Sequence, residues 1–147
     1  MWAPFMTFAL HLLGYDLWFY ISHRALHSPI LWPLHRIHHE KQFPHWPDTY
    51  HGHWIETVGQ SLGFGAPWLF TSFWSWPASL LALLFVNARG LARHDPRTMT
   101  WIGNHHLLHH QFPAWNYGEY WLDRLFGTAC PYQNRVVDGI VFLGLRI

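Results

Sequence analysis

Three short groups of histidines carry most of the potential chemistry of this chain. They are HRALH (His23, His27), HRIHH (His35, His38, His39) and HHLLHH (His105, His106, His109, His110). Positions three and four apart lie on one face of a helix, so we predict that each group presents one coherent patch of imidazoles. Eight of these side chains, all except His105, can converge from three helices. That number exceeds the need of one metal ion and suits two ions with open positions.

Imidazole is the only metal ligand that the chain supplies in quantity. Fourteen histidines outnumber the eight acidic residues, and the single cysteine, Cys130, excludes a thiolate cluster and an intramolecular disulfide. Imidazole binds Fe, Zn, Cu or Ni, whereas a structural zinc needs only four closed ligands. Two irons close together can share the reduction of dioxygen and oxidise an unactivated C–H bond, which is the bond type that a lipid chain offers.

Other readings of the histidines stay open at this point. A metalloprotease is disfavoured because HEKQF, beginning at His39, lacks the second histidine of H-E-x-x-H. A haem-binding electron carrier would leave most of the imidazoles idle. A histidine-rich membrane protein for metal binding or transport should place ligands along a path through the bilayer, but only His11 lies inside an apolar stretch.

The composition favours a protein that faces lipid. Charged residues make up 12% of the 147 residues, aromatic residues make up 19%, and 11 residues are Trp, a side chain favoured at membrane interfaces. The net charge of +1 provides no field of one sign, so nucleic acid is not an expected partner. We find no signal peptide at the start of the chain.

The elements that must position the histidines are predicted to be helices. Residues 2–21 are about the length of a bilayer-crossing helix, and His11 and Asp16 within them must face protein. Residues 54–86, which Gly and Pro interrupt, predict a helical hairpin that crosses the bilayer or penetrates part of it. The last residues, 139–147, fit a strand or a buried tail.

Basic residues follow both apolar regions and predict an orientation. They are Arg24, Arg36 and Lys41 after the first region, and Arg89, Arg93 and Arg97 after the second. By the positive-inside tendency, both basic segments face the cytoplasm. We therefore expect an all-α fold in one domain, residues 1–147, with integral membrane helices and a cytoplasmic helical cap that holds a histidine-rich di-metal site.

Two segments resemble a known family. Residues 16–39, DLWFYISHRALHSPILWPLHRIHH, resemble the D-x-x-x-Y-x-x-H-R-x-x-H and L-W-x-x-H-x-x-H-H motifs of the fatty acid hydroxylase/sterol desaturase superfamily of membrane di-iron oxidases. Residues 105–128, HHLLHHQFPAWNYGEYWLDRLFGT, are similar to its H-x-x-H-H, N-[YF]-G and W-D-R-L-F-G-T motifs. Between them the match is looser, since HWIE offers His53 and Glu56 but has Trp54 in place of a proline.

The resemblance implies a set of site residues. The expected metal ligands are His23, His27, His35, His38, His39, His94, His106, His109 and His110. His94 enters this set only through the resemblance, which places a histidine shortly before the last motif. Further ligands, or residues that orient a ligand, are His53, His105, Asp16 and Tyr20, the last two through a hydrogen bond to an imidazole N–H. His11, His45 and His51 are not expected to bind metal.

The resemblance also implies an activity. It predicts a di-iron centre with O2 as co-substrate, an electron donor of cytochrome b5 or ferredoxin type, and hydroxylation or desaturation of a fatty acyl or sterol-type lipid that enters from the membrane. Asn116 and Asp123 are expected to set a turn and anchor the last helix. Family members usually carry further apolar segments before the first motif, so this chain is expected to be a fragment or a compact member.

Overall fold

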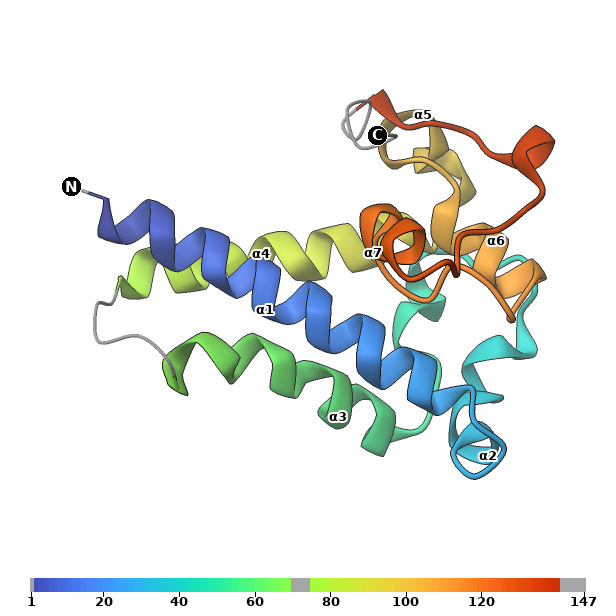
Figure 1. Ribbon diagram of the computed structural model, residues 1–147, viewed down its shortest axis with the longest axis horizontal. Helices are drawn as coiled ribbons and strands as arrows, with labels where there is room; N and C mark the ends of the chain where they lie inside the picture. Colours follow the sequence, from blue (N-terminus) through green and yellow to red (C-terminus); the bar gives the residue numbers. More distant parts are fainter. Residues whose placement is uncertain (1, 70–74, 141–147) are drawn as a thin grey trace.

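Helices make up the regular structure of this chain. The computed structural model describes residues 2–69 and 75–140, and within these ranges no strand occurs, as the all-α prediction required (Figure 1). Three long helices lie side by side, and short helical segments gather at one end of them. The long helices are α1 (Ala3–Leu26), α3 (Trp54–Gly65) and α4 (Trp76–Arg93).

Helix α1 is the element on which the other two long helices pack. Pro4 lies in its first turn, where a missing N–H costs nothing, and the helix ends at Leu26 with His27 as its C-cap. The buried face of α1 is unusually polar. It consists of Thr7, His11, Asp16, Tyr20, His23 and Leu26. The predicted inward direction of His11 and Asp16 is therefore confirmed, while large apolar side chains of the same helix are exposed.

Glycine permits the close approach of α3 to α1. A Cβ at Gly63 would lie 2.7 Å from Cγ of Trp18 and closer still to its Cβ. One turn earlier, the Trp18 indole N–H donates to the Gly59 carbonyl at 2.7 Å, but a Cβ at Gly59 would meet no atom within 4 Å. Gly63 is thus the position at which α3 packs directly against Cβ and Cγ of Trp18.

The predicted hairpin over residues 54–86 is present as two helices. Helix α3 ends at Gly65, the 3-10 segment η3 (Ala66–Leu69) follows, and α4 begins at Trp76 with Pro77 in its first turn. The two helices pack mainly on α1 rather than on each other. Within the described ranges, no helix combines the length and the apolar composition that crossing a membrane requires. The predicted tail, residues 139–147, lies mostly outside the described residues.

Short segments form the second half of the molecule. They are α2 (Trp32–His35), η1 (His38–Glu40), η2 (Trp46–Tyr50), η4 (Pro96–Thr98), α5 (Met99–Ile102), α6 (His105–Gln111), α7 (Tyr120–Leu125) and η5 (Gln133–Arg135). They surround the C-terminal ends of α1 and α4 (Figure 1). The second and third histidine groups lie in this half, and His23 and His27 of the first group lie at the end of α1 that meets it.

The Gly63 contact predicts a difference between two alanine variants of one helix. Gly63→Ala should lower the free energy of unfolding by about 1–3 kcal/mol, because the new methyl group must push α3 away from Trp18. Gly59→Ala, its matched control, should raise it by about 0.5–1 kcal/mol, because alanine is the better helix former and has open space there. Chemical unfolding in detergent followed by circular dichroism measures both values. Equal effects would contradict the packing described.

Candidate metal centre

Nine buried or half-buried histidines form two groups. Within each group, one ring nitrogen of every member lies within 4.8 Å of the others. The first group is His23, His27, His35, His39 and His109, and the second is His38, His94, His106 and His110. These are the nine side chains that the sequence analysis selected, including His94, which is the C-cap of α4.

The prediction of one coherent patch per motif holds for His23 and His27, which share the first group, but it is wrong for the two H-x-x-H-H motifs, each of which divides between the groups. Residues four apart stay together, as His35 and His39 do, while His38 joins the other group. In α6 the arrangement is reversed, since His106 and His110 lie in the second group and His109 in the first. The second motif is also not one helix, because α2 ends at His35 and η1 begins at His38. Each H-x-x-H-H motif therefore links both sites.

Backbone carbonyls fix the tautomers of several imidazoles. Nδ1 of His38 lies 3.0 Å from the His51 carbonyl, and Nδ1 of His94 lies 2.9 Å from the Gly90 carbonyl. A carbonyl oxygen only accepts, so Nδ1 carries the proton and Nε2 of a neutral ring presents a lone pair. The same holds for His109, whose Nδ1 lies 2.6 Å from the Trp115 carbonyl.

The Nε2 atoms within each group face one another, and those of His38 and His94 both present lone pairs. Nε2 of His38 and Nε2 of His94 are 3.1 Å apart, and Nε2 of His106 is 3.0 Å from that of His94. In the first group, Nε2 of His109 lies 3.1 Å from Nε2 of both His27 and His39. Two lone pairs at this distance repel unless a positive charge lies between them. The donor set thus fits a pair of metal ions, and it is nearly all nitrogen.

Burial keeps these imidazoles in the form that binds metal. It lowers the pKa of His27 and His94 to about 3 and that of His35 to about 4, with neighbouring histidines adding to the effect for His27 and His94. The side chains are therefore neutral near pH 7. Nε2 of His110 is buried without a hydrogen-bond partner among the described residues, which marks it as a further atom available for coordination.

Glu56 is a residue whose role the sequence analysis did not predict. Its Oε1 lies 2.9 Å from Nδ1 of His35, and both side chains are buried. A carboxylate behind a histidine orients the ring and raises its basicity, which is a common arrangement at metal sites. Desolvation raises the pKa of Glu56 to about 7. The signal in the sequence was HWIE, the looser match between the two segments that resemble the family.

The four additional candidates lie outside both groups. His53 precedes α3, and its Nδ1 accepts from the Ile55 N–H at 3.2 Å. His105 lies with Nε2 3.0 Å from Oδ2 of Asp123. The expected hydrogen bonds of Asp16 and Tyr20 to an imidazole are wrong, because these side chains have other partners. Asp16 pairs with Arg89, and the Tyr20 hydroxyl lies 3.0 Å from that of Thr128.

Asp123 and Asn116 shape the loop that faces the first group, as predicted. The Asp123 carboxylate accepts from the backbone N–H groups of Tyr117 and Gly118 and from the Thr128 hydroxyl. Asn116 has φ of 61°, and its side-chain amide donates to the His105 carbonyl at 2.9 Å. The fixed loop directs the Tyr117 carbonyl to Nδ1 of His23 at 2.5 Å. The loop therefore orients the His23 ring.

Comparisons with known proteins agree with this geometry. The sequence profile described as "Fatty acid hydroxylase" matches residues 8–128, which include all nine histidines. A putative methylsterol monooxygenase of Dictyostelium discoideum is 33% identical over 146 residues, covering 88% of this chain and 52% of the relative. Methylsterol monooxygenase 1 of Rattus norvegicus is 30% identical over 132 residues, covering 80% of this chain and 44% of the relative.

The match is to part of each relative. The chain spans about half the length of the curated relatives it matches. No solved structure matches it significantly. The profile match and the relatives nevertheless cover most of this sequence. The chain belongs to the fatty acid hydroxylase family.

Proposed function

We propose that the chain is a di-iron oxygenase that hydroxylates or desaturates a C–H bond of a lipid. The observation that carries the proposal is the pair of histidine groups whose Nε2 atoms face one another in a buried site. Five imidazoles would hold one iron and four the other. Bound iron would supply the reduction of O2 and the oxidation of the C–H bond.

The protein's own contribution is to orient the histidine rings and to exclude water from the site. Carbonyl groups hold several of the proposed ligand rings in one tautomer, and the Glu56 carboxylate lies 2.9 Å from Nδ1 of His35. Burial of the histidines keeps them neutral and lowers the access of water to the oxidising site. Hydroxylation consumes O2, two electrons and two protons and releases water. The electrons must come from outside the chain, and a cytochrome b5- or ferredoxin-type protein is the proposed donor.

A lipid substrate is supported by the names of the relatives and by the surface. The relatives are named methylsterol monooxygenases, and the family is that of fatty acid hydroxylases, so fatty acyl and sterol-type lipids are the proposed substrate classes. The half of the molecule remote from the histidines exposes large apolar side chains. They are Trp2, Phe5, Leu13, Leu62, Trp68, Leu69, Trp76, Leu80, Leu81 and Leu84.

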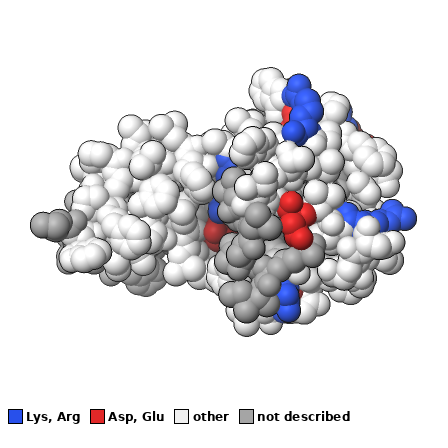
Figure 2. Space-filling model, turned by 90° about the horizontal axis from the view of Figure 1, so that it is seen from above, with Lys and Arg blue, Asp and Glu red and all other residues white. Residues whose placement is uncertain are grey.

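We propose that this half contacts the membrane. In Figure 2 the lobe at the end of the bundle where α1 begins carries no Lys, Arg, Asp or Glu on the visible face. The charges gather over the histidine half. Exposed apolar surface of this extent is typical of proteins that contact lipid or a partner. With Lys and Arg near the histidines, the metal site would face the cytoplasm.

Metal analysis tests the proposed centre directly. After anaerobic reconstitution with ferrous iron, the chain should hold about two irons, and His109→Ala should retain about one or fewer, because His109 belongs to the five-histidine group. His45→Asn, at an exposed histidine outside both groups, is the control and should bind like the unaltered chain. A chain that binds no iron but holds stoichiometric haem would overturn the proposal.

The role of Glu56 predicts a graded loss of metal affinity. Glu56→Ala should weaken metal binding about 10- to 100-fold, because His35 loses the carboxylate that orients it. Glu56→Gln keeps an acceptor for Nδ1 of His35 and should lose less. Competition with a chelator measures the affinities, and Glu40→Ala, at an exposed carboxylate, serves as the control. Equal affinity of Glu56→Ala and Glu40→Ala would refute the role.

Lipid profiling tests the activity. Cells that express the full chain should accumulate an oxidised or desaturated lipid that is absent from cells expressing His109→Ala at the same level. Mass spectrometry of total lipid extracts identifies the product and distinguishes hydroxylation from desaturation by its mass. Identical profiles at matched expression, with iron present in the unaltered chain, would sink the oxygenase proposal.

A further inference from the structure

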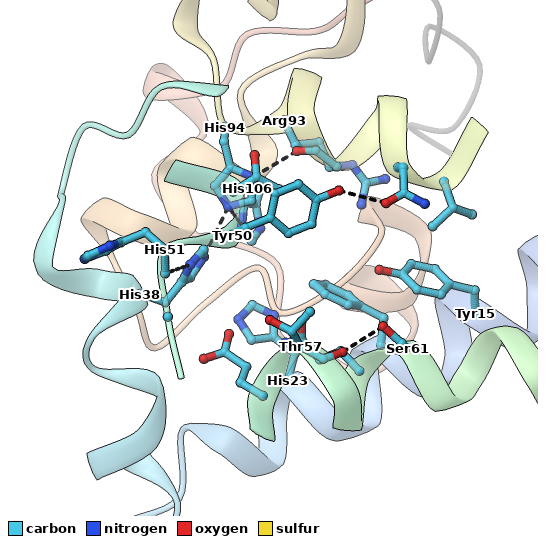
Figure 3. A pocket seen from close by; sticks show the side chains of 18 of the residues that line it. Tyr15, His23, His38, Tyr50, His51, Thr57, Ser61, Arg93, His94 and His106 are labelled. Carbon is cyan, nitrogen blue, oxygen red and sulfur yellow. Dashed lines mark hydrogen bonds between the residues drawn. The ribbon is translucent and has the colours of Figure 1, made fainter. Parts of the chain in front are cut away.

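The two histidine groups have one side that faces a cavity and another that does not. A cavity of about 140 Å³ reaches them from the side of α3 and α4, and both groups contribute to its wall, with His23 and His106 as examples (Figure 3). Its described lining includes His23 and His35 of the first group but neither His27 nor His39. These two imidazoles therefore lie against a different part of the protein.

Trp32 is the aromatic side chain that lies against them. Its ring centroid is 5.2 Å from that of His27, 5.5 Å from that of His39 and 6.1 Å from that of His35. His27 and His39 are half-buried, whereas all four members of the second group are buried. The first group is thus nearer to the surface. Trp32 is itself half-buried, so its ring links these imidazoles to the surface.

This contact offers a short path for electrons. The proposed reaction consumes two electrons that must come from outside the chain, and electron tunnelling between proteins weakens steeply with distance. An external donor that touches Trp32 would be separated from the first group by a single aromatic ring. Access through the second group would be longer, because each of its imidazoles is buried.

The surface beside Trp32 is apolar at its centre and basic at its edge. Ile30, in the turn before α2, is 87% exposed. Arg36 is exposed and follows Trp32 by one helical turn, since its N–H donates to the Trp32 carbonyl at 2.8 Å. Residues 17–39 include Arg24 and Arg36 but no acidic residue. Such a surface complements an acidic protein, and Trp and Arg are enriched where binding energy concentrates in interfaces.

The position of α2 in the molecule favours a protein partner over a lipid. Helix α2 lies at the opposite end of the molecule from the N-terminus of α1 (Figure 1). The apolar half proposed to contact the membrane lies at that N-terminal end. A water-soluble protein can therefore reach α2 while the apolar half is in contact with lipid.

We propose that Trp32 is the point of electron entry, and that Ile30, Trp32 and Arg36 form the docking surface of an acidic one-electron carrier protein. The inference rests on the proposed oxygenase function and locates its electron supply. Each transfer oxidises the carrier by one electron and reduces the metal site by one electron, with no bond made or broken. Two transfers supply one turnover. The cavity on the side of α3 and α4 stays free for the reacting molecule.

Binding to the zinc-loaded full chain in lipid nanodiscs tests the docking surface without turnover, because zinc has no redox chemistry. The probes are the soluble haem domain of a cytochrome b5-type protein and, separately, a ferredoxin, and surface plasmon resonance measures their affinities. Arg36→Glu should weaken binding about 5- to 10-fold at low salt, and less as salt rises. Arg135→Glu is the control, since Arg135 is exposed and η5 lies across the histidine half from α2 (Figure 1).

Reduction kinetics test the electron path. The oxidised iron-loaded chain is mixed anaerobically with the reduced carrier, and stopped-flow absorption follows oxidation of the carrier. Trp32→Leu should slow this reaction about 10-fold, as expected for truncation of a tryptophan at the centre of an interface. Trp32→Phe keeps an aromatic ring and should lose less. Trp101→Leu is the matched control, because Trp101 lies on α5 and is 60% exposed.

A small reductant separates electron entry from a structural role. Dithionite needs no docking surface, so it should reduce the unaltered chain, Trp32→Leu and Trp101→Leu at equal rates. If Trp32 only packed against the histidines, its loss would change the iron content or the reduction by dithionite as well. Should Trp32→Leu hold no iron, Ile30→Ser decides in its place, because its exposed side chain can be shortened without opening the histidine site.

Three results would contradict the proposal. The first is a Trp32→Leu chain that holds two irons and accepts electrons from the carrier at the unaltered rate. The second is binding of both carriers to Arg36→Glu or Ile30→Ser as tightly as to the unaltered chain. The third is a loss of binding to anionic lipid vesicles, rather than to the carriers, in Ile30→Ser, which would assign this surface to the membrane.

Failure of this proposal is distinguishable from failure of the oxygenase function. A chain that oxidises a lipid with electrons from a carrier, while Trp32→Leu and Arg36→Glu behave like the unaltered chain, would keep the function and lose this entry point. A chain that forms no lipid product, yet accepts electrons in a Trp32-dependent way, would give the reverse result.

Discussion

The central constraint of this structure is the juxtaposition of imidazole lone pairs in a buried space. Nε2 of His38 and Nε2 of His94 face each other at 3.1 Å while both Nδ1 atoms lie within hydrogen-bond distance of carbonyls. Protonation would relieve the repulsion, but burial lowers the pKa of both rings. Charge must come from elsewhere, and a metal ion would supply it. The folded state is therefore expected to be more stable with metal than without, because metal binds only this arrangement.

Hydrogen bonds and ion pairs elsewhere in the histidine half hold the imidazoles in that arrangement. Asp123 accepts three hydrogen bonds and fixes the loop before α7, and this loop brings the Tyr117 carbonyl to His23. A buried ion network then attaches the loop to the long helices, since Arg89 of α4 pairs with both Asp16 of α1 and Glu119. Removing one member would leave an uncompensated buried charge, which costs about 3–5 kcal/mol. The network therefore couples ligand geometry to the packing of α1 and α4.

The sequence alone selected the nine histidines that the fold brings together, but not their division into two groups. All nine histidines were recognisable because imidazole spacing and the family motifs are local properties of the chain. Their division between two groups was not, because it depends on the break after His35 and on which neighbours α6 meets. Arg89, the partner of Asp16, and Thr128, a partner of Tyr20, lie 73 and 108 residues away, so helical spacing could not reveal them. Helix content was likewise predictable, whereas Glu56 required the fold to bring α3 behind His35.

The inverted polarity of α1 connects the two halves of the molecule. Its buried face holds Asp16, Tyr20 and His23, whereas the large apolar side chains of Leu13 and Ile21 are exposed. Water would solvate this outer face poorly, and lipid would solvate it well. The outer face of α3 is likewise apolar, since Trp54, Val58 and Leu62 are exposed. The polar face of α1 leads to His23, so one helix carries both the apolar surface and a side chain of the histidine site.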